Sequence, residues 1–100
     1  MKYYKVTAWK NGSNGYGIRV RKKDYMNIEN WRRILVGRER VERQGKGGKK
    51  RSFTIRCPEI RSMAIKKFLS KNKRDHWVKG NPPELTLCSL GNGEFKLKLK

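Results

Sequence analysis

Apolar and polar residues alternate along both ends of this chain, which is the pattern of strands that bury one face. Residues 3–9 and 16–21 alternate on either side of a turn rich in asparagine and glycine, and residues 85–88 and 95–99 alternate around a Gly-Asn-Gly turn. Both segments predict β-hairpins. In the first hairpin the arginines should point away from the core, because apolar residues occupy the alternate positions.

Two further strands are expected in the middle of the chain, on either side of a basic segment. Residues 31–36 predict a third strand, and Phe53, Ile55 and Cys57 mark the inward face of a fourth. Residues 43–52 between them are rich in glycine and cations and contain no acidic residue. We predict that this segment is a mobile basic loop, because it has no apolar side chains whose burial would offset the entropy of ordering.

One main helix is predicted between this region and the closing hairpin. Pro58 suits a first helical position, Glu59 suits the first turn, and apolar residues recur at helical spacing until Asn72. Residues 25–30 have room for one helical turn. The element order is then β-β-β-β-α-β-β. We predict a single domain over residues 1–100, mainly β (α+β), whose small, mostly antiparallel sheet curls into a barrel-like shape because closure removes exposed strand edges.

The charge of the chain indicates what this domain binds. Lysine and arginine number 27 against 8 acidic residues, which gives a formal net charge of +19 on 100 residues. A small domain needs far less charge to stay soluble, and this excess repels itself in the compact state. Phosphate backbones are the commonest polyanions that neutralise such a surface. We therefore expect a nucleic-acid-binding protein. A merely solvated basic surface and a module that binds an acidic protein are the alternatives.

The expected contacts come from outward cations of the first hairpin, from the basic loop and from the start of the predicted helix. Lysine and arginine suit phosphate, whereas the asparagines of the hairpin turn suit base edges in a groove of double-stranded DNA. The candidate nucleic-acid-binding residues are Lys10, Asn11, Asn14, Arg19, Arg21, Lys22, Lys23, Lys49, Lys50, Arg51, Arg56 and Arg61.

Aromatic residues leave a second partner open, although DNA is favoured over RNA. Tyr3, Trp9 and Tyr16 lie among cations and would suit stacking on RNA or on single-stranded bases. Four other aromatic residues fall on apolar faces, where packing in the core is the better interpretation. These are Trp31, Phe53, Phe68 and Phe95.

A further alternative is a small metal-dependent nuclease. Pro83 and Glu84, followed by Glu94 and Lys96, have the spacing in which two carboxylates hold a metal ion beside a lysine. Alternation along the last strand instead favours Glu94 as an ordinary solvent-facing residue. The lone His76 has no nucleophile or second ligand beside it. We therefore expect a non-enzymatic protein with no catalytic residues.

The chain carries few other chemical signals. Cys57 and Cys88 form no metal-ligand motif, and no phosphate-binding glycine motif precedes a helix. We expect no metal, no cofactor and no small-molecule substrate. No apolar run approaches a signal peptide or a membrane helix, so we expect no membrane partner. The prediction is an intracellular, soluble protein, cytoplasmic or nucleoid-associated, with reduced thiols.

Three stretches, taken in order, resemble a known family: GYGIRVRKKDY at residues 15–25, FTIRC at residues 53–57 and AIKKFLSKNKRDHWVKGNPPELTL at residues 64–87. Together they look like the DNA-binding pseudobarrel domain of plant auxin-response-type transcription factors, which also serves as a DNA-recognition domain in some restriction endonucleases.

This resemblance implies a barrel with two loops that grip the major groove of DNA. By position, the first loop would be residues 10–16, supported by Arg19, Arg21 and Lys22. The second would be residues 56–61.

Overall fold

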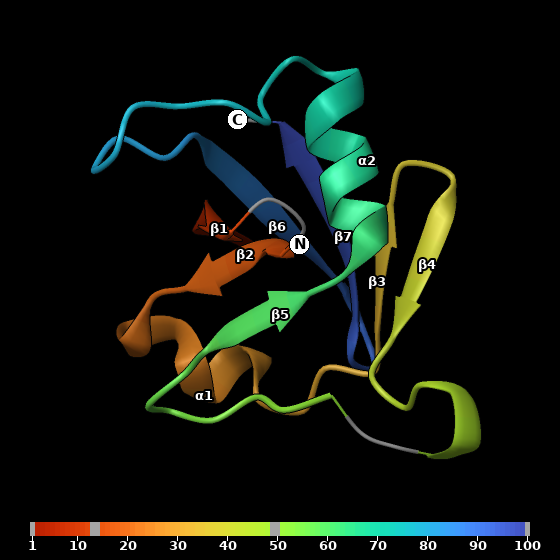
Figure 1. Cartoon of the computed structure of the whole chain (residues 1–100). Helices are drawn as coiled ribbons and strands as arrows, with labels where there is room; N and C mark the ends of the chain where they lie inside the picture. The colour runs from red at the N-terminus through yellow and green to blue at the C-terminus, as the bar shows by residue number, and fades with distance from the viewer. Residues whose placement is uncertain (1, 13–14, 49–50, 100) are drawn as a thin grey trace.

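The structure, a computed structural model, describes residues 2–12, 15–48 and 51–99. Seven strands form one curled sheet, a half-barrel, in the order β4-β3-β7-β6-β1-β2-β5 (Figure 1). Neighbouring strands pair antiparallel except β3 and β7, which are parallel. The strands are β1 (Tyr3–Asn11), β2 (Gly15–Val20), β3 (Arg33–Val36), β4 (Glu39–Glu42), β5 (Glu59–Arg61), β6 (Glu84–Gly91) and β7 (Glu94–Leu99).

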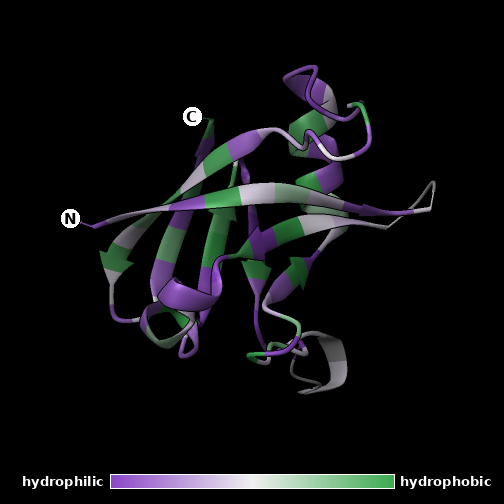
Figure 2. Ribbon diagram, turned by 90° about the vertical axis from the view of Figure 1, so that its left-hand side faces the viewer, coloured by the Kyte–Doolittle hydropathy of each residue, from purple (hydrophilic) through white to green (hydrophobic). Residues whose placement is uncertain are grey.

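The fold class predicted from the sequence is confirmed, because the protein is mainly β and its sheet curls. Alternate residues of each strand face opposite sides, so Val6, Ala8, Ile18 and Val20 are buried on the inner face. Figure 2 shows the resulting hydrophobic and hydrophilic bands along the strands. The inner faces of the strands and one side of helix α2 (Met63–Lys71) enclose a hydrophobic core.

Both predicted hairpins are confirmed, in β1–β2 and in β6–β7. Strand β6 also pairs with β1, so the two hairpins form the continuous centre of the sheet. A third hairpin, β3–β4, was not predicted beyond its first strand. Its second strand is short and has one buried residue, Val41, which leaves no alternation to detect in the sequence.

The predicted fourth strand at Phe53, Ile55 and Cys57 is wrong. The backbone turns there, because the Cys57 amide donates to both the carbonyl and the hydroxyl oxygen of Thr54, each at 3.1 Å. Phe53 is buried as expected, whereas Ile55 is 56% exposed and Cys57 also faces solvent. The strand in this part of the chain is instead β5, which pairs with β2 and buries Ile60.

The main helix begins later than predicted. Pro58 and Glu59 do not open it, because Glu59 is the first residue of β5. Ser62 is the N-cap of α2, and its hydroxyl oxygen accepts a hydrogen bond from the amide of Ala64 at 3.1 Å. This bond satisfies one of the amide groups that a helix start leaves without a partner.

The end of the helix was predicted correctly, and a short helical turn lies where the sequence has room for one. Asn72 is the C-cap of α2, and its side-chain amide donates to the carbonyl oxygen of Phe68 at 2.7 Å. The single helical turn is α1 (Tyr25–Ile28), which follows the 3-10 helix η1 (Lys22–Asp24). Ile28 points from α1 into the core and is fully buried.

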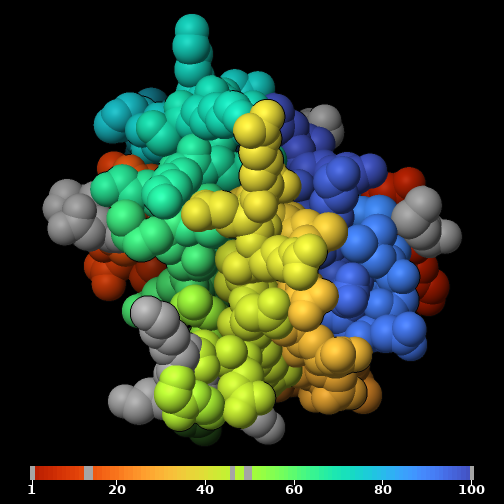
Figure 3. Space-filling model, turned by 90° about the vertical axis from the view of Figure 1, so that its right-hand side faces the viewer, coloured from red at the N-terminus to blue at the C-terminus, as the bar shows by residue number. Residues whose placement is uncertain are grey.

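Helix α2 lies across the opening of the half-barrel. It packs against β2 on one side and against β3 and β4 on the other, and Figure 3 shows it beside β4 on the surface. Ile65 and Leu69 are its fully buried residues, and Lys67 forms an ion pair with Glu39 of β4 at 3.5 Å. The helix therefore covers the gap between β4 and β5, the edge strands that a closed barrel would join.

One arginine side chain links these two edge strands. Arg51 Nε donates to the carbonyl oxygen of Glu42, the last residue of β4, at 3.1 Å. Arg51 Nη1 donates to the carbonyl oxygen of Arg61, the last residue of β5, at 3.0 Å. A charged donor thus satisfies one edge carbonyl of each strand, and the sheet is held closed at this point without a strand pair.

The basic segment over residues 43–52 is anchored at both ends. The Arg51 amide donates to the carbonyl oxygen of Arg43 at 2.7 Å, and the short 3-10 helix η2 (Lys46–Gly48) lies between them. Lys49 and Lys50 lie outside the described residues. The mobility of this segment stays a prediction, but Arg51 belongs to the framework of the barrel.

We expect Arg51→Gln to lower the free energy of unfolding by about 1–2 kcal/mol, because two charge-assisted hydrogen bonds between the edge strands are lost. For a domain of this size that corresponds to about 5–10 °C in Tm, measured by thermal melting followed by circular dichroism. Arg56→Gln, which removes an exposed arginine with no hydrogen bond to either edge, is the matched control and should melt like the wild type. Equal Tm values for the two variants would show that the Arg51 link contributes nothing.

Candidate nucleic-acid interface

The outer face of β2 and β5 brings together cations that are far apart in the sequence. Arg19 of β2 lies opposite Glu59 of β5, and Arg19 Nη2 lies 3.0 Å from Glu59 Oε1. The carboxylate side chain is 10% exposed, whereas the arginine side chain is 53% exposed. A guanidinium has five N–H donors, so this ion pair orients Arg19 and leaves further donors directed at solvent.

Beside this ion pair the surface forms a hollow of about 400 Å³ with a basic lining. Arg21, Lys22 and Arg56 are exposed around it, together with Arg19, and Glu59 is the one acidic residue of the lining. Arg21, Lys22 and Arg56 form no ion pair with any residue that the structure describes. Cations gathered in a concavity focus a positive field there and attract anions.

The end of the β1–β2 hairpin carries a second group of cations. Lys10 Nζ lies 5.6 Å from the ring centre of Tyr16 and 5.9 Å from that of Trp77, and Lys66 Nζ of α2 lies 5.6 Å from Tyr16. The two rings meet edge to face, with centres 6.3 Å apart. Asn11 is exposed at the same end. Aromatic rings rather than carboxylates hold these ammonium groups, so their positive charge is not neutralised.

Trp9 and Arg61 meet on the outer face at this end of the sheet. Both lie opposite Gly17, which sits between them on β2. The Arg61 guanidinium carbon lies 4.4 Å from the centre of the Trp9 ring, and Arg61 remains exposed. A Cβ atom at Gly17 would come within 2.3 Å of the carbonyl oxygen of Ile60. Glycine is therefore required for β2 and β5 to approach each other here.

Most of the predicted binding residues fall along this region, although not all of them. We call the outer surface formed by Arg19, Arg21, Lys22, Arg56 and Arg61 the β2–β5 surface. Asn11 adjoins it at the hairpin end, Lys10 lies at the same end with its ammonium group on the other side of the sheet, and Lys23 is exposed next to Lys22 in η1. Arg51 is set apart, because its guanidinium is bonded to the edge strands. Asn14, Lys49 and Lys50 lie outside the described residues.

Two residues of the hairpin end were not singled out from the sequence. Lys66 is one of the polar residues of α2, and nothing in the sequence relates it to Tyr16. Trp77 lies in an irregular segment with no periodicity. Of the aromatic residues proposed for RNA, Tyr16 is 5% exposed and its hydroxyl donates to the carbonyl oxygen of Asp75, so it is part of the core.

The strand register separates the two carboxylates of the nuclease alternative. Glu84 begins β6 and Glu94 begins β7, and in an antiparallel hairpin these starts lie at opposite ends, about 20 Å apart. Glu84 lies 3.5 Å from Lys5, and Glu94 lies 3.6 Å from Arg33. In the described part of the chain, no group of three or more His, Cys, Asp or Glu residues is placed to hold a metal ion.

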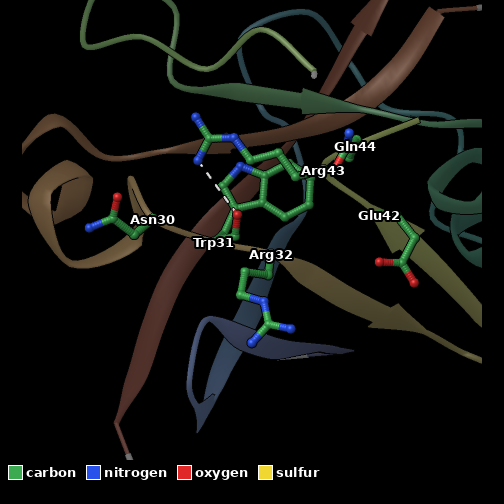
Figure 4. Close-up of a pocket in the computed structure, with 6 residues that line it drawn as sticks. All are labelled: Asn30, Trp31, Arg32, Glu42, Arg43 and Gln44. Atoms are coloured by element: carbon green, nitrogen blue, oxygen red, sulfur yellow. Dashed lines mark hydrogen bonds between the residues drawn. The ribbon is translucent and has the colours of Figure 1, made fainter. Parts of the chain in front are cut away.

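A second hollow, of about 440 Å³, lies at the base of β3 and β4 (Figure 4). Arg43 crosses the ring of Trp31 there, with its guanidinium carbon 5.8 Å from the centre of that ring and 5.9 Å from that of Phe53. Arg43 Nη1 donates to the carbonyl oxygens of Glu29 and Trp31. Because the guanidinium is half-buried and bonded to the backbone, Arg43 packs the base of the barrel and is a poor candidate for phosphate binding.

No protein family, curated protein or solved structure that was compared with this chain matches it. Within the described residues, the helices are too short or too polar to cross a membrane. The functional conclusion therefore rests on the geometry and charge of the chain itself.

We expect the pure protein to leave supercoiled plasmid intact in the presence of magnesium or manganese, because its two candidate carboxylates do not converge. Glu94→Gln should change the free energy of unfolding by less than about 1 kcal/mol, since it removes one exposed ion pair with Arg33. Glu42→Gln is the matched control, because Glu42 pairs with the same arginine. Nicking by the wild type that disappears in Glu94→Gln but persists in Glu42→Gln would establish a nuclease.

Proposed function

We infer that this protein binds double-stranded DNA without cleaving it, through the β2–β5 surface and the adjoining end of the β1–β2 hairpin. The observation that carries this inference is the basic hollow, where Arg19, Arg21, Lys22 and Arg56 surround the single carboxylate of Glu59. Solubility alone does not require cations to gather in one concavity. A nucleic-acid backbone suits this arrangement, because it presents several phosphates in a row.

The dimensions of the surface suit a short stretch of duplex. The six residues of β2 span about 17 Å between the hairpin end and the hollow. Each strand of DNA advances about 3.4 Å along the helix axis per nucleotide, so this length corresponds to about five base pairs. Phosphate contacts at both ends of β2 would fix the register of the protein on the duplex.

The hairpin supplies the candidate for base contacts. A two-stranded ribbon fits the major groove, which is about 12 Å wide, and asparagine side chains can bond adenine edges there. Asn11 is exposed at the end of the β1–β2 hairpin, and Asn14 of the same turn remains a candidate from the sequence. The resemblance to pseudobarrel DNA-binding domains supports the same orientation, since residues 10–16 and 56–61 would both face the DNA.

RNA and single strands are less favoured partners. Stacking on unpaired bases generally uses several exposed aromatic residues. Among the three aromatic candidates, Tyr16 is buried and Tyr3 lies at the opposite end of β1. Trp9 alone adjoins the β2–β5 surface. An acidic protein would also be attracted by the charge, but nothing in the shape of this surface points to one.

We expect binding of duplex DNA to depend steeply on salt. If about six phosphates are neutralised, the log-log slope should be about −5, and affinity should fall more than about a hundredfold between about 50 and 200 mM salt. The double variant Arg21→Gln/Arg56→Gln should reduce the slope by about 2, since it removes two phosphate contacts. Fluorescence anisotropy with a labelled duplex measures both quantities.

The matched control is Lys96→Gln/Lys98→Gln, which removes the same charge from exposed positions on β7. This control should keep most of the wild-type slope. Equal losses in the two double variants would show that net charge, and not the β2–β5 surface, determines binding. A wild-type slope near zero would mean that the charge is only a solvated surface.

A further inference from the structure

Trp9 differs from the aromatic residues of the core because it lies on the outer face of the sheet. Its neighbours along β1, Ala8 and Lys10, point to the inner side. The Trp9 ring is half-buried, with the guanidinium of the exposed Arg61 4.4 Å from its centre. A cation–π pair at an exposed site adds only about 0.5–1 kcal/mol to stability. Stability is therefore a weak reason for a large aromatic ring on a solvent-facing strand.

We propose that the Trp9–Arg61 pair binds one unpaired base of duplex DNA, held out of the helix against the guanidinium plane. The proposal rests on the DNA binding inferred above and adds which feature of the DNA is recognised. A guanidinium is planar, so it can stack on an aromatic ring with one face and on a base with the other. Both the ring and the base are π systems that attract the cation between them.

The sheet holds this pair in place before any ligand arrives. Trp9, Gly17 and Arg61 form one row across β1, β2 and β5, and because Gly17 has no side chain, the side chains of Trp9 and Arg61 meet across β2. The backbone of Arg61 is fixed twice, by its pairing with Gly17 and by the hydrogen bond from Arg51 to its carbonyl oxygen. Preorganised groups bind with a smaller loss of conformational entropy.

The number of stacking sites indicates that the protein binds a single unpaired base and not a stretch of single-stranded DNA. On the outer face of the described sheet, Trp9 with Arg61 is the only cation–π pair. The exposed aromatic residue of β1 is Tyr3, six residues and about 20 Å from Trp9. Proteins that bind single strands stack successive bases on a series of aromatic rings. One stack beside a phosphate-binding surface suits one unpaired base flanked by duplex.

One neighbouring cation is placed to hold the flanking backbone. Arg19 lies two residues from Gly17 on the same strand and on the same outer face. Lys10 is next to Trp9 in sequence but does not take part, because its ammonium group lies over Tyr16 and Trp77 on the other side of the sheet. An unpaired base therefore reaches Arg61 while the phosphate on the Arg19 side of it remains near positive charge.

The experiment compares three labelled duplexes of one sequence by fluorescence anisotropy: fully paired, with one extra unpaired adenine, and with an abasic sugar in place of that adenine. We expect the wild type to bind the adenine bulge about tenfold more tightly than the paired duplex, because stacking on one base is worth about this factor. The abasic bulge has the same backbone flexibility without the base. It should bind like the paired duplex.

Two variants test the two members of the pair. Trp9→Val removes the ring and keeps a residue that favours strands, and Arg61→Lys keeps the charge and removes the plane. Each should lose the preference, so that it binds the adenine bulge and the paired duplex with equal affinity, whatever its affinity for the paired duplex. Tyr3→Val is the matched control, because it removes an exposed aromatic ring from the same strand, and it should keep the preference. Arg61→Lys changes only an exposed side chain, so it tests the proposal even if Trp9→Val fails to fold.

Equal affinity of the wild type for the adenine bulge and the paired duplex, or for the adenine and abasic bulges, would overturn the proposal. A preference retained by folded Trp9→Val or Arg61→Lys would overturn it too. So would tighter binding of the same sequence as single-stranded DNA or as RNA. Loss of the base preference leaves duplex binding intact, whereas tighter binding to single-stranded DNA or to RNA, or the absence of salt-sensitive binding to every one of these nucleic acids, contradicts the proposed function itself.

Discussion

The pairing of β2 with β5 is the interaction on which the rest of the structure depends. Strand β5 has three residues, and it reaches β2 only because Gly17 has no side chain to meet the carbonyl oxygen of Ile60. The pairing places Glu59 against Arg19 and Arg61 beside Trp9. It also directs the chain into α2, which fills the opening of the half-barrel. A short contact of backbone with backbone thus fixes both the core and the outer surface.

An open sheet leaves two edges, and this protein covers them in a way that stabilises the candidate site. Helix α2 spans the gap between β4 and β5 on the side of the core, and Arg51 joins the ends of the same strands. The carbonyl oxygen that Arg51 bonds belongs to Arg61, whose side chain lies over Trp9. The end of β5 is therefore fixed through its backbone, by Arg51, and through the side chain of Arg61, by Trp9. The link between the two edge strands and the position of Arg61 beside Trp9 depend on the same residue, Arg51.

The sequence predicted the elements that have a long local pattern and missed those that depend on distant partners. Apolar and polar residues alternate over many positions in the hairpins β1–β2 and β6–β7, so the sequence predicts that one face of each is buried. Phe53, Ile55 and Cys57 alternate equally well, but a turn closed by Thr54 bends the chain there. Strands of three or four residues, such as β4 and β5, carry too few positions for a period to show. The parallel pairing of β3 with β7 joins segments about sixty residues apart, a separation that no local pattern encodes.

The candidate site, too, was predictable only in part from the sequence. Its charge follows from the composition, whereas the place where the cations gather depends on the fold. Composition predicts cations on the surface, yet the surplus charge is spread over the whole molecule, and Lys96 and Lys98 on β7 are exposed, like Arg21 and Arg56. Elsewhere on the sheet, carboxylates neutralise single cations, as Glu42 and Glu94 do at Arg33. Around β2 and β5, several cations instead line one hollow that contains a single carboxylate, an arrangement that focuses a positive field. Net charge would account for attraction to any polyanion, whereas the hollow beside the Trp9–Arg61 pair would account for binding at this surface and not along β7.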